Sequence, residues 1–94
     1  MAEVVWTETA LSDLDAIAAY IAHDSPARAK QVIRNIFQAA EPLADFPEMG
    51  RIIPEIGENH RREIFCYSYR LMYLLRDDKV YVQAIYHGSW EYRQ

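Results

Sequence analysis

The sequence YRLMYLLRDDKVYVQAIYH, residues 69–87, decides the fold. Aromatic and aliphatic residues dominate 69–75, and β-branched and aromatic residues dominate 80–87, which is typical of β-strands. The polar residues 77–79 between them predict a turn. Because so short a connection joins neighbouring antiparallel strands, this stretch predicts a β-hairpin.

Strict alternation along 80–87 predicts the two faces of the second strand. The even-numbered residues form one face and the odd-numbered residues the other: Val80, Val82 and Ala84 against Tyr81, Gln83, Ile85 and His87. Upstream, residues 62–66 predict another strand, joined to the hairpin by a turn near Tyr67-Ser68. Residues 4–6 form a further short β-prone run.

Two amphipathic helices are predicted between the first β-prone run and the later strands. Apolar residues recur at helical spacing from Leu11 to Ile21 and from Ala29 to Ala40. Thr7 or Thr9 is the expected cap of the first helix, and Ser25-Pro26 is a start signal for the second.

Pro42 predicts that the second helix ends or kinks near Ala40, because proline does not fit a helix interior. The element order is therefore β-α-α-β-β-β. We expect one α+β domain, residues 1–94, in which a helical hairpin packs on a small antiparallel sheet.

The stretch from Phe46 to Gly57 contains proline and glycine without periodicity, which predicts an ordered loop. Apolar side chains are expected to pin this loop to the core, namely Phe46, Met49, Ile52, Ile53 and Ile56. Aromatic residues elsewhere are expected to be core or half-buried sheet residues, namely Trp6, Tyr20, Phe37, Phe65, Tyr73 and Tyr81.

Length and composition exclude several classes of protein. A chain of 94 residues is too short for a doubly wound nucleotide-binding fold or a TIM barrel. The single cysteine, Cys66, excludes an internal disulfide and a zinc site of paired cysteines, and we expect it to be a buried apolar residue. We expect a cytoplasmic protein without membrane span, since neither a signal peptide nor a long apolar run is present. No cofactor or bound metal is expected.

The net charge of −4 is unevenly distributed. Residues 1–50 carry three basic and eight acidic groups, and residues 51–94 carry seven basic and six acidic groups. The acidic first half argues against a broad phosphate-binding surface, whereas four arginines between Arg61 and Arg76 predict a local basic face on the strands.

Short motifs follow one another in a recognisable order along the chain. They are Trp6-Thr7, Ala10, Asp13-Leu14, Ile17 and Tyr20-Ile21, then Ala29, Phe46-Pro47 and Met49-Gly50-Arg51, then Arg62-Glu63, Tyr69-Arg70-Leu71, Tyr73 and His87-Gly88. In their order and spacing the chain resembles the RelE/ParE superfamily of bacterial type II toxin–antitoxin toxins, most closely its ParE-like branch.

This resemblance implies a cognate antitoxin that neutralises the protein, and possible dimers or higher-order toxin–antitoxin complexes. Toxins of the ParE type poison DNA gyrase by stabilising its cleaved complex with DNA, and those of the RelE type cut mRNA on the ribosome. A non-toxic relative that only binds its antitoxin is a third reading. Because the fold is shared by all three, the site residues must distinguish them.

Metal-independent RNA cleavage needs a base, a cation for the phosphorane and an acid for the leaving oxygen. By resemblance to the RelE branch, Arg61 or Arg62 matches the first basic position, Arg70 matches the arginine of the Tyr-Arg-Leu strand, and Tyr92 is the candidate for a tyrosine of the tail. The chain departs from that branch at Gly88-Ser89-Trp90, where those toxins carry Lys or Arg.

Another ribonuclease branch uses Glu, Arg and His, for which Glu48 or Glu55, Arg70 and His87 are the candidates. Structural roles are the alternatives. Arg70 would then pair with Glu63 on the adjacent strand, and His87 would hydrogen-bond at a strand end.

The expected partner-binding residues are Arg61, Arg62, Arg70, Arg76 and Trp90. Trp90 either covers the end of the sheet or anchors a partner. The basic stripe Arg28, Lys30 and Arg34 is expected to be a solvated helix face or to pair with the acidic first helix. Taken together, these observations favour a toxin that binds gyrase without a catalytic centre of its own, with a ribosome-dependent ribonuclease as the alternative.

Overall fold

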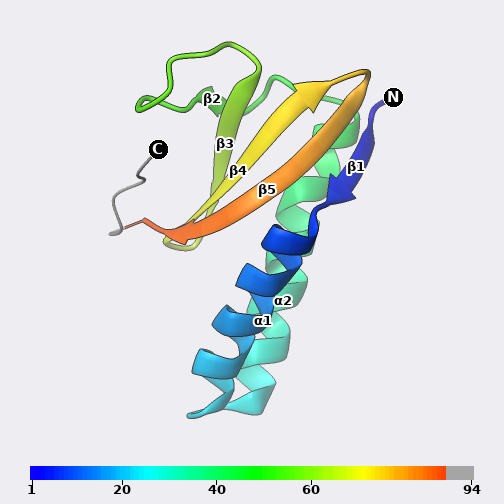
Figure 1. The fold of residues 1–94 in the computed structure, drawn as a ribbon. Helices are drawn as coiled ribbons and strands as arrows, with labels where there is room; N and C mark the ends of the chain where they lie inside the picture. Colours follow the sequence, from blue (N-terminus) through cyan, green and yellow to red (C-terminus); the bar gives the residue numbers. More distant parts are fainter. Residues whose placement is uncertain (89–94) are drawn as a thin grey trace.

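The computed structural model describes residues 1–88, and its elements follow the expected order (Figure 1). They are β1 (Glu3–Trp6), α1 (Glu8–Ala22), α2 (Pro26–Ala40), the 3-10 helix η1 (Glu41–Ala44), β2 (Arg51–Ile52), β3 (Arg61–Cys66), β4 (Tyr69–Arg76) and β5 (Lys79–His87). The α+β class and the helical hairpin are thus confirmed.

The five strands form one mixed sheet in the order β1-β5-β4-β3-β2. The pairs from β2 to β5 are antiparallel, but β1 runs parallel to β5 along one edge. The expected antiparallel sheet is confirmed for β2 to β5, whereas the parallel pairing of β1 makes the whole sheet mixed. The short β2 lies in the stretch expected to be loop. Both departures arise from pairings between distant segments, which local sequence patterns do not encode.

The helix ends are where the capping residues predict them. The Thr7 hydroxyl accepts a hydrogen bond from the Ala10 N–H at 3.2 Å, and the Ser25 hydroxyl accepts one from the Arg28 N–H at 3.1 Å. Helix α2 ends at Ala40, and Pro42 lies in the 3-10 turn that follows. The capping residues therefore mark where α1 and α2 begin, and Pro42 marks where α2 ends.

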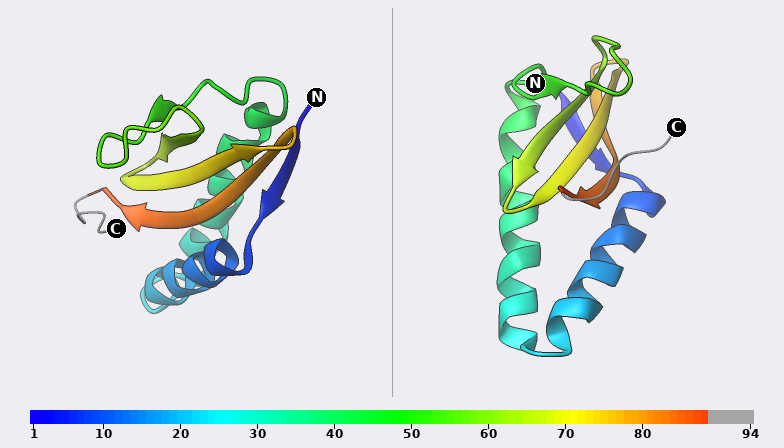
Figure 2. Two further views of the ribbon diagram at one scale, coloured as in Figure 1. Left: turned by 45° about the horizontal axis from the view of Figure 1, so that its top comes forward. Right: turned by 90° about the vertical axis from the view of Figure 1, so that its left-hand side faces the viewer.

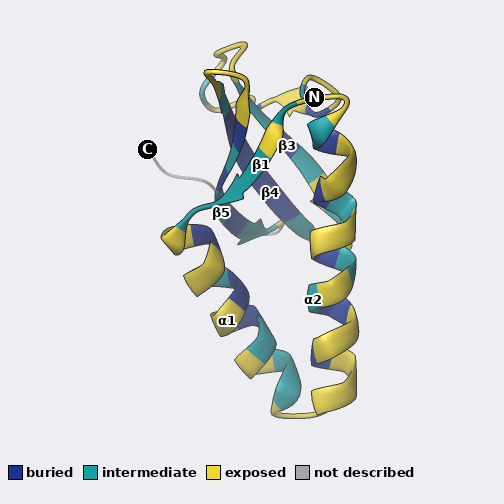
Figure 3. Cartoon of the chain, turned by 90° about the vertical axis from the view of Figure 1, so that its right-hand side faces the viewer, coloured by how far each residue is buried: buried dark blue, intermediate teal, exposed yellow. Residues whose placement is uncertain are grey.

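The two helices meet at residues 23–25 and diverge toward the sheet (Figure 2). Their buried residues line the inner sides of this V and the sheet face between its arms (Figure 3). The main core combines residues of both helices with β4 and β5, including Leu14, Ile36, Leu71, Val80 and Ile85. No helix in the described residues 1–88 is long and apolar enough to cross a membrane.

A β-bulge changes the faces of β5. Tyr73 is opposite Val82 and Met72 is opposite Ala84, so Gln83 is an extra residue in the ladder. Ile85 therefore returns to the helix-facing core that also contains Val80. The simple alternation expected beyond Val82 was wrong for this reason.

Several apolar residues expected in the core are exposed. Tyr20 is 82% exposed on α1, and Phe65 is 51% exposed on β3. In the loop between η1 and β2, Phe46 and Met49 are exposed as well. Of the five loop residues expected to pin residues 46–57, only Ile53 is fully buried, because the loop is held mainly by polar contacts.

Candidate functional site

The candidate site is the sheet face that points away from the helices. Leu71 and Tyr73 of β4 belong to the helix-side core, so the alternating residues Arg70, Met72 and Leu74 face the other way. On β3, the residues directly opposite these three are Phe65, Glu63 and Arg61, in the same order. The face therefore combines apolar side chains with arginines and a carboxylate.

Four charged side chains form a continuous charge network on this face, consisting of Arg51, Glu55, Glu63 and Arg70. The Nε–H groups of Arg51 and Arg70 each donate to one oxygen of Glu63 at 2.7 Å. The two terminal nitrogens of Arg70 donate to the two oxygens of Glu55 at 2.8 and 2.9 Å. The expected ion pair between Arg70 and Glu63 is confirmed, and Glu55 adds a bidentate partner.

Burial within the charge network is graded. The Glu63 side chain is 0% exposed and that of Arg70 is 7% exposed, whereas that of Arg51 is 56% exposed. Burial of an ionised carboxylate without partners carries a large desolvation penalty. The hydrogen bonds from the two arginines offset this penalty for Glu63. The formal charges of these four side chains, two positive and two negative, cancel.

The charge network also fixes the protonation of its members. Hydrogen bonds from Arg70, against the opposing effect of desolvation, lower the pKa of Glu55 to about 2. The Glu55 carboxylate, aided by Glu63, raises the pKa of Arg70 above its usual range. Both groups therefore stay ionised throughout the physiological range.

Arg62 lies on the opposite side of β3 from Glu63 and fastens two loops. One terminal nitrogen donates to the carbonyls of Glu48 and Gly50 at 3.1 and 2.9 Å. Its Nε and other terminal nitrogen donate to the backbone and side-chain oxygens of Asn59. The guanidinium is thus occupied by acceptors of the chain itself.

Tyr73 completes the anchoring of the loop before β2. Its hydroxyl donates to the Pro47 carbonyl at 2.7 Å and accepts from the Gly50 N–H at 3.1 Å. A Cβ on Gly50 would lie 2.6 Å from both this hydroxyl and the Glu63 carbonyl, so only glycine fits. Burial raises the pKa of Tyr73 and keeps the hydroxyl as a donor. The Met49-Gly50-Arg51 motif therefore positions Arg51 for Glu63.

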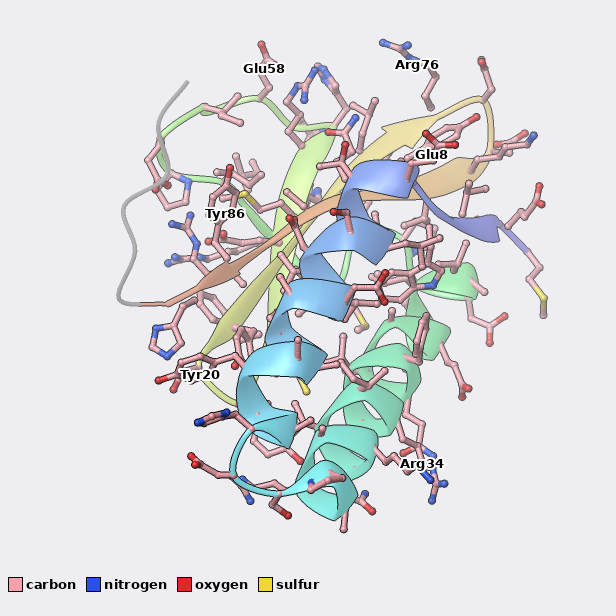
Figure 4. The ribbon with its side chains drawn as sticks, turned by 60° about the horizontal axis from the view of Figure 1, so that its bottom comes forward. Glu8, Tyr20, Arg34, Glu58, Arg76 and Tyr86 are labelled. Atoms are coloured by element: carbon pink, nitrogen blue, oxygen red, sulfur yellow. The ribbon has the colours of Figure 1, made fainter. Side chains whose placement is uncertain are left out.

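The remaining arginines expected to bind partners differ in how they are held. Arg61 donates to Glu58 at 3.1 Å and to Gln83 at 3.2 Å. Arg76 is exposed at the end of β4, without an ion pair to any described residue, and points outward (Figure 4). Arg76 is therefore the arginine of this set whose charge is available to a partner.

His87 does not join the charge network. Its ring packs edge-on against Tyr69, with ring centroids 5.5 Å apart. Both line a groove of about 500 Å³ between the sheet and α1, to which Asp13 and Tyr20 also contribute. Arg70 faces the other side of the sheet, so the structure brings Glu55 and Arg70 together but leaves His87 apart; Glu48 contributes only a backbone carbonyl to Arg62.

Trp90 and Tyr92 lie outside the described residues. The basic stripe of α2 (Arg28, Lys30 and Arg34) is exposed, which confirms the expected solvated helix face. Within residues 1–88, no ion pair links this stripe to α1, so the alternative of helix–helix salt bridges was wrong. Cys66 is half-buried, and burial raises the pKa of its thiol. The described residues contain no group of three or more His, Cys, Asp or Glu side chains that could hold a metal.

Contacts that the sequence did not predict include one at Asp13 and one at Arg51. The Asp13 carboxylate accepts from the Ile85 N–H at 2.9 Å, beyond the point where β1 stops pairing with β5. Arg51 stacks over Phe65, with Cζ 5.1 Å from the ring centroid. An acidic residue on the α1 side that faces the sheet was the available signal for the first contact, whereas the second depends on the pairing of β2 with β3.

Comparison with known proteins places this geometry in a family. The model of the ParE toxins of type II toxin–antitoxin systems, parDE, matches residues 4–92. The toxin RelE2 of Caulobacter vibrioides is 36% identical over 89 residues, which cover 95% of this chain and 98% of that protein. The chromosomal ParDE system from P. aeruginosa has a solved structure with the same fold, with a TM-score of 0.75 at 22% identity over 90% of this chain and 94% of that chain. The chain therefore belongs to the ParE toxin family of the RelE/ParE superfamily, as a toxin of the type II toxin–antitoxin class.

Proposed function

We propose that this toxin acts by binding DNA gyrase and has no ribonuclease centre of its own. The observation that carries the proposal is that Arg70 is fully engaged by carboxylates of the chain itself. Its Nε–H and both terminal nitrogens donate to Glu63 and Glu55, so the guanidinium is neutralised within the chain. A ribonuclease would need such a cation to face the phosphorane.

The other ribonuclease candidates support the same proposal. Arg62 donates to acceptors of two loops, and His87 lies on the helix side of the sheet. A base, a cation and an acid must converge on one phosphate. The side chains of Arg62, Arg70 and His87 instead point to different places. A toxin that acts by protein binding does not need that convergence.

Membership in the ParE family implies a cognate antitoxin as a partner. We propose that complex formation with the antitoxin silences the toxin. Induction of the toxin with and without the gene beside it tests this directly. Arrested growth that the neighbour restores is the expected result, and normal growth without the neighbour would favour a non-toxic binding protein.

The gyrase proposal is tested by supercoiling of relaxed plasmid with purified gyrase and increasing toxin. Arg76→Ala is the informative variant, because this exposed arginine has no ion pair to a described residue and its loss should leave the fold intact. Arg34→Ala on α2 is the matched control, an exposed arginine at a distant place on the surface (Figure 4).

We expect wild type and Arg34→Ala to inhibit supercoiling equally and Arg76→Ala to inhibit it more weakly. Full gyrase activity with wild-type toxin would contradict the proposal. Primer extension on translated mRNA from induced cells then distinguishes the alternative, since discrete cuts that depend on Arg70 and His87 would indicate a ribosome-dependent ribonuclease.

A further inference from the structure

We propose that Arg70 and Arg51 form a binding site for a carboxylate side chain of a protein partner, and that Glu55 occupies this site in the free chain. The site lies on the sheet face opposite the helices. It is defined by the terminal nitrogens of Arg70 and by the exposed guanidinium of Arg51. The inference does not depend on whether gyrase is the target.

Glu55 is the member of the charge network that can be exchanged. Arg51, Glu63 and Arg70 all lie on strands, whereas Glu55 lies on the connection between β2 and β3. The Glu55 side chain is 31% exposed, compared with 0% for that of Glu63. Glu63 binds the Nε of Arg70 through Oε1, whereas Arg51 binds the other oxygen of Glu63. Loss of Glu55 would therefore uncover the terminal nitrogens of Arg70 while Glu63 kept that arginine in place.

The geometry selects a carboxylate as the ligand. Both terminal nitrogens of Arg70 bind the two oxygens of one planar group at 2.8 and 2.9 Å, the side-by-side arrangement that carboxylates prefer. The third donor, Nε, is already held by the Glu63 carboxylate, which would repel the additional oxygens of a phosphate. The overall charge of −4 also disfavours a polyphosphate backbone.

An external carboxylate must compete with Glu55, which is present at high effective concentration because it belongs to the same chain. Arg51 and Phe65 provide the compensating contacts. The terminal nitrogens of Arg51 make no hydrogen bond to any described residue, and its guanidinium covers Phe65, which is 51% exposed. A peptide with an acidic residue next to an apolar one fits this surface.

The test uses acetate as the probe and the Nε–Hε signals of Arg70 and Arg51 in nitrogen-15 NMR spectra as the readout. Wild type, Glu55→Ala and Glu55→Gln are titrated with acetate at constant ionic strength. Glu58→Ala is the matched control, because Glu58 lies on the same connection but pairs with Arg61 and His60. Dihydrogen phosphate, of the same charge, is the competing probe.

We expect saturable shifts of both arginine signals in the two Glu55 variants, at acetate concentrations about tenfold below those affecting wild type or Glu58→Ala. Absence of saturation in the Glu55 variants, or equal response in Glu58→Ala, would overturn the proposal. Tighter binding of phosphate than of acetate would overturn the assignment of the ligand class.

If removal of Glu55 unfolds the chain, circular dichroism replaces NMR in the same titration. Acetate must then restore folding more effectively than chloride at equal ionic strength. Equal recovery in the two salts would contradict a specific carboxylate site, because general screening acts alike for both.

Discussion

Among single residues, Arg70 and Arg51 bind the same carboxylate, that of Glu63, but differ in how deeply their own side chains are buried. Both donate Nε–H to Glu63 at 2.7 Å, but their side chains are 7% and 56% exposed. The free energy of an ion pair depends strongly on its burial, and removal of one buried partner leaves an uncompensated charge. The two arginines therefore form a natural matched pair.

We predict that Arg70→Met lowers the free energy of unfolding by about 3 kcal/mol, because Glu63 and Glu55 lose their shared cation. Arg51→Met should cost less than about 1 kcal/mol, since the Arg51 side chain is 56% exposed and Glu63 keeps Arg70 as its buried partner. Urea unfolding followed by circular dichroism measures both. Equal losses in the two variants would show that burial does not govern this network.

Glu55 predicts a dependence of stability on pH. Its pKa is about 2 in the folded chain, below the ordinary value of 4.5, so the folded state binds this proton less readily than the unfolded state. The stabilisation is complete above the ordinary pKa and is lost as the pH falls toward the folded pKa. Between these limits, the melting temperature of wild type should fall more steeply than that of Glu55→Gln; parallel curves would contradict the assigned role.

At the scale of elements, the loop before β2 is held by the Tyr73 hydroxyl. Tyr73→Phe removes its bonds to Pro47 and Gly50, and should cost about 1–3 kcal/mol because a buried N–H and a carbonyl lose their partner. Tyr81→Phe is the control, since no hydrogen bond of its hydroxyl to the described residues exists. Thermal unfolding of both variants gives the comparison, and an unchanged melting temperature for Tyr73→Phe would refute this anchoring role.

The turn between β4 and β5 stores backbone strain that can be released. Asp77 and Asp78 have φ values of 52° and 58°, the left-handed conformation at both central positions of a type I′ turn. Asp78→Gly should stabilise the chain by about 0.5–1 kcal/mol, whereas Asp78→Ala should destabilise it. Melting temperatures that rank in the opposite order would contradict this assignment of the turn.

Local signals predicted most of the elements. Ser25-Pro26 and Pro42 marked the limits of α2, and the polar residues 77–79 marked the last hairpin turn. The bulge at Gln83 was not predictable, because it depends on how β5 pairs with β4. The parallel pairing of β1 with β5 is likewise a long-range contact without a local signature.

The candidate site was predictable in part for the same reason. The pairing of Arg70 with Glu63 follows from adjacent strands, and it was among the expected alternatives. The capture of Arg70 by Glu55 depends on the path of the connection between β2 and β3, which sequence spacing does not determine. The separation of His87 from Arg70 follows from the bulge that the alternating pattern concealed.

At the scale of the whole molecule, the uneven charge has a structural meaning. The basic half of the sequence forms β2 to β5, yet most of its arginines are occupied within the chain, by Glu55, Glu58, Glu63 and loop carbonyls. The sheet is therefore not a bare cationic surface for nucleic acid. Because most of these arginines are neutralised within the chain, we propose that the toxin binds a protein target, DNA gyrase, rather than cleaving RNA directly.

The most direct test measures cleaved DNA in a gyrase reaction. Plasmid, gyrase and ATP are incubated with increasing toxin, protein is denatured and digested, and linear DNA is quantified. We expect linear DNA to rise with toxin concentration, and prior addition of the cognate antitoxin to prevent the rise. Linear DNA at the level of the toxin-free reaction, with supercoiling intact, would contradict the proposed action on gyrase.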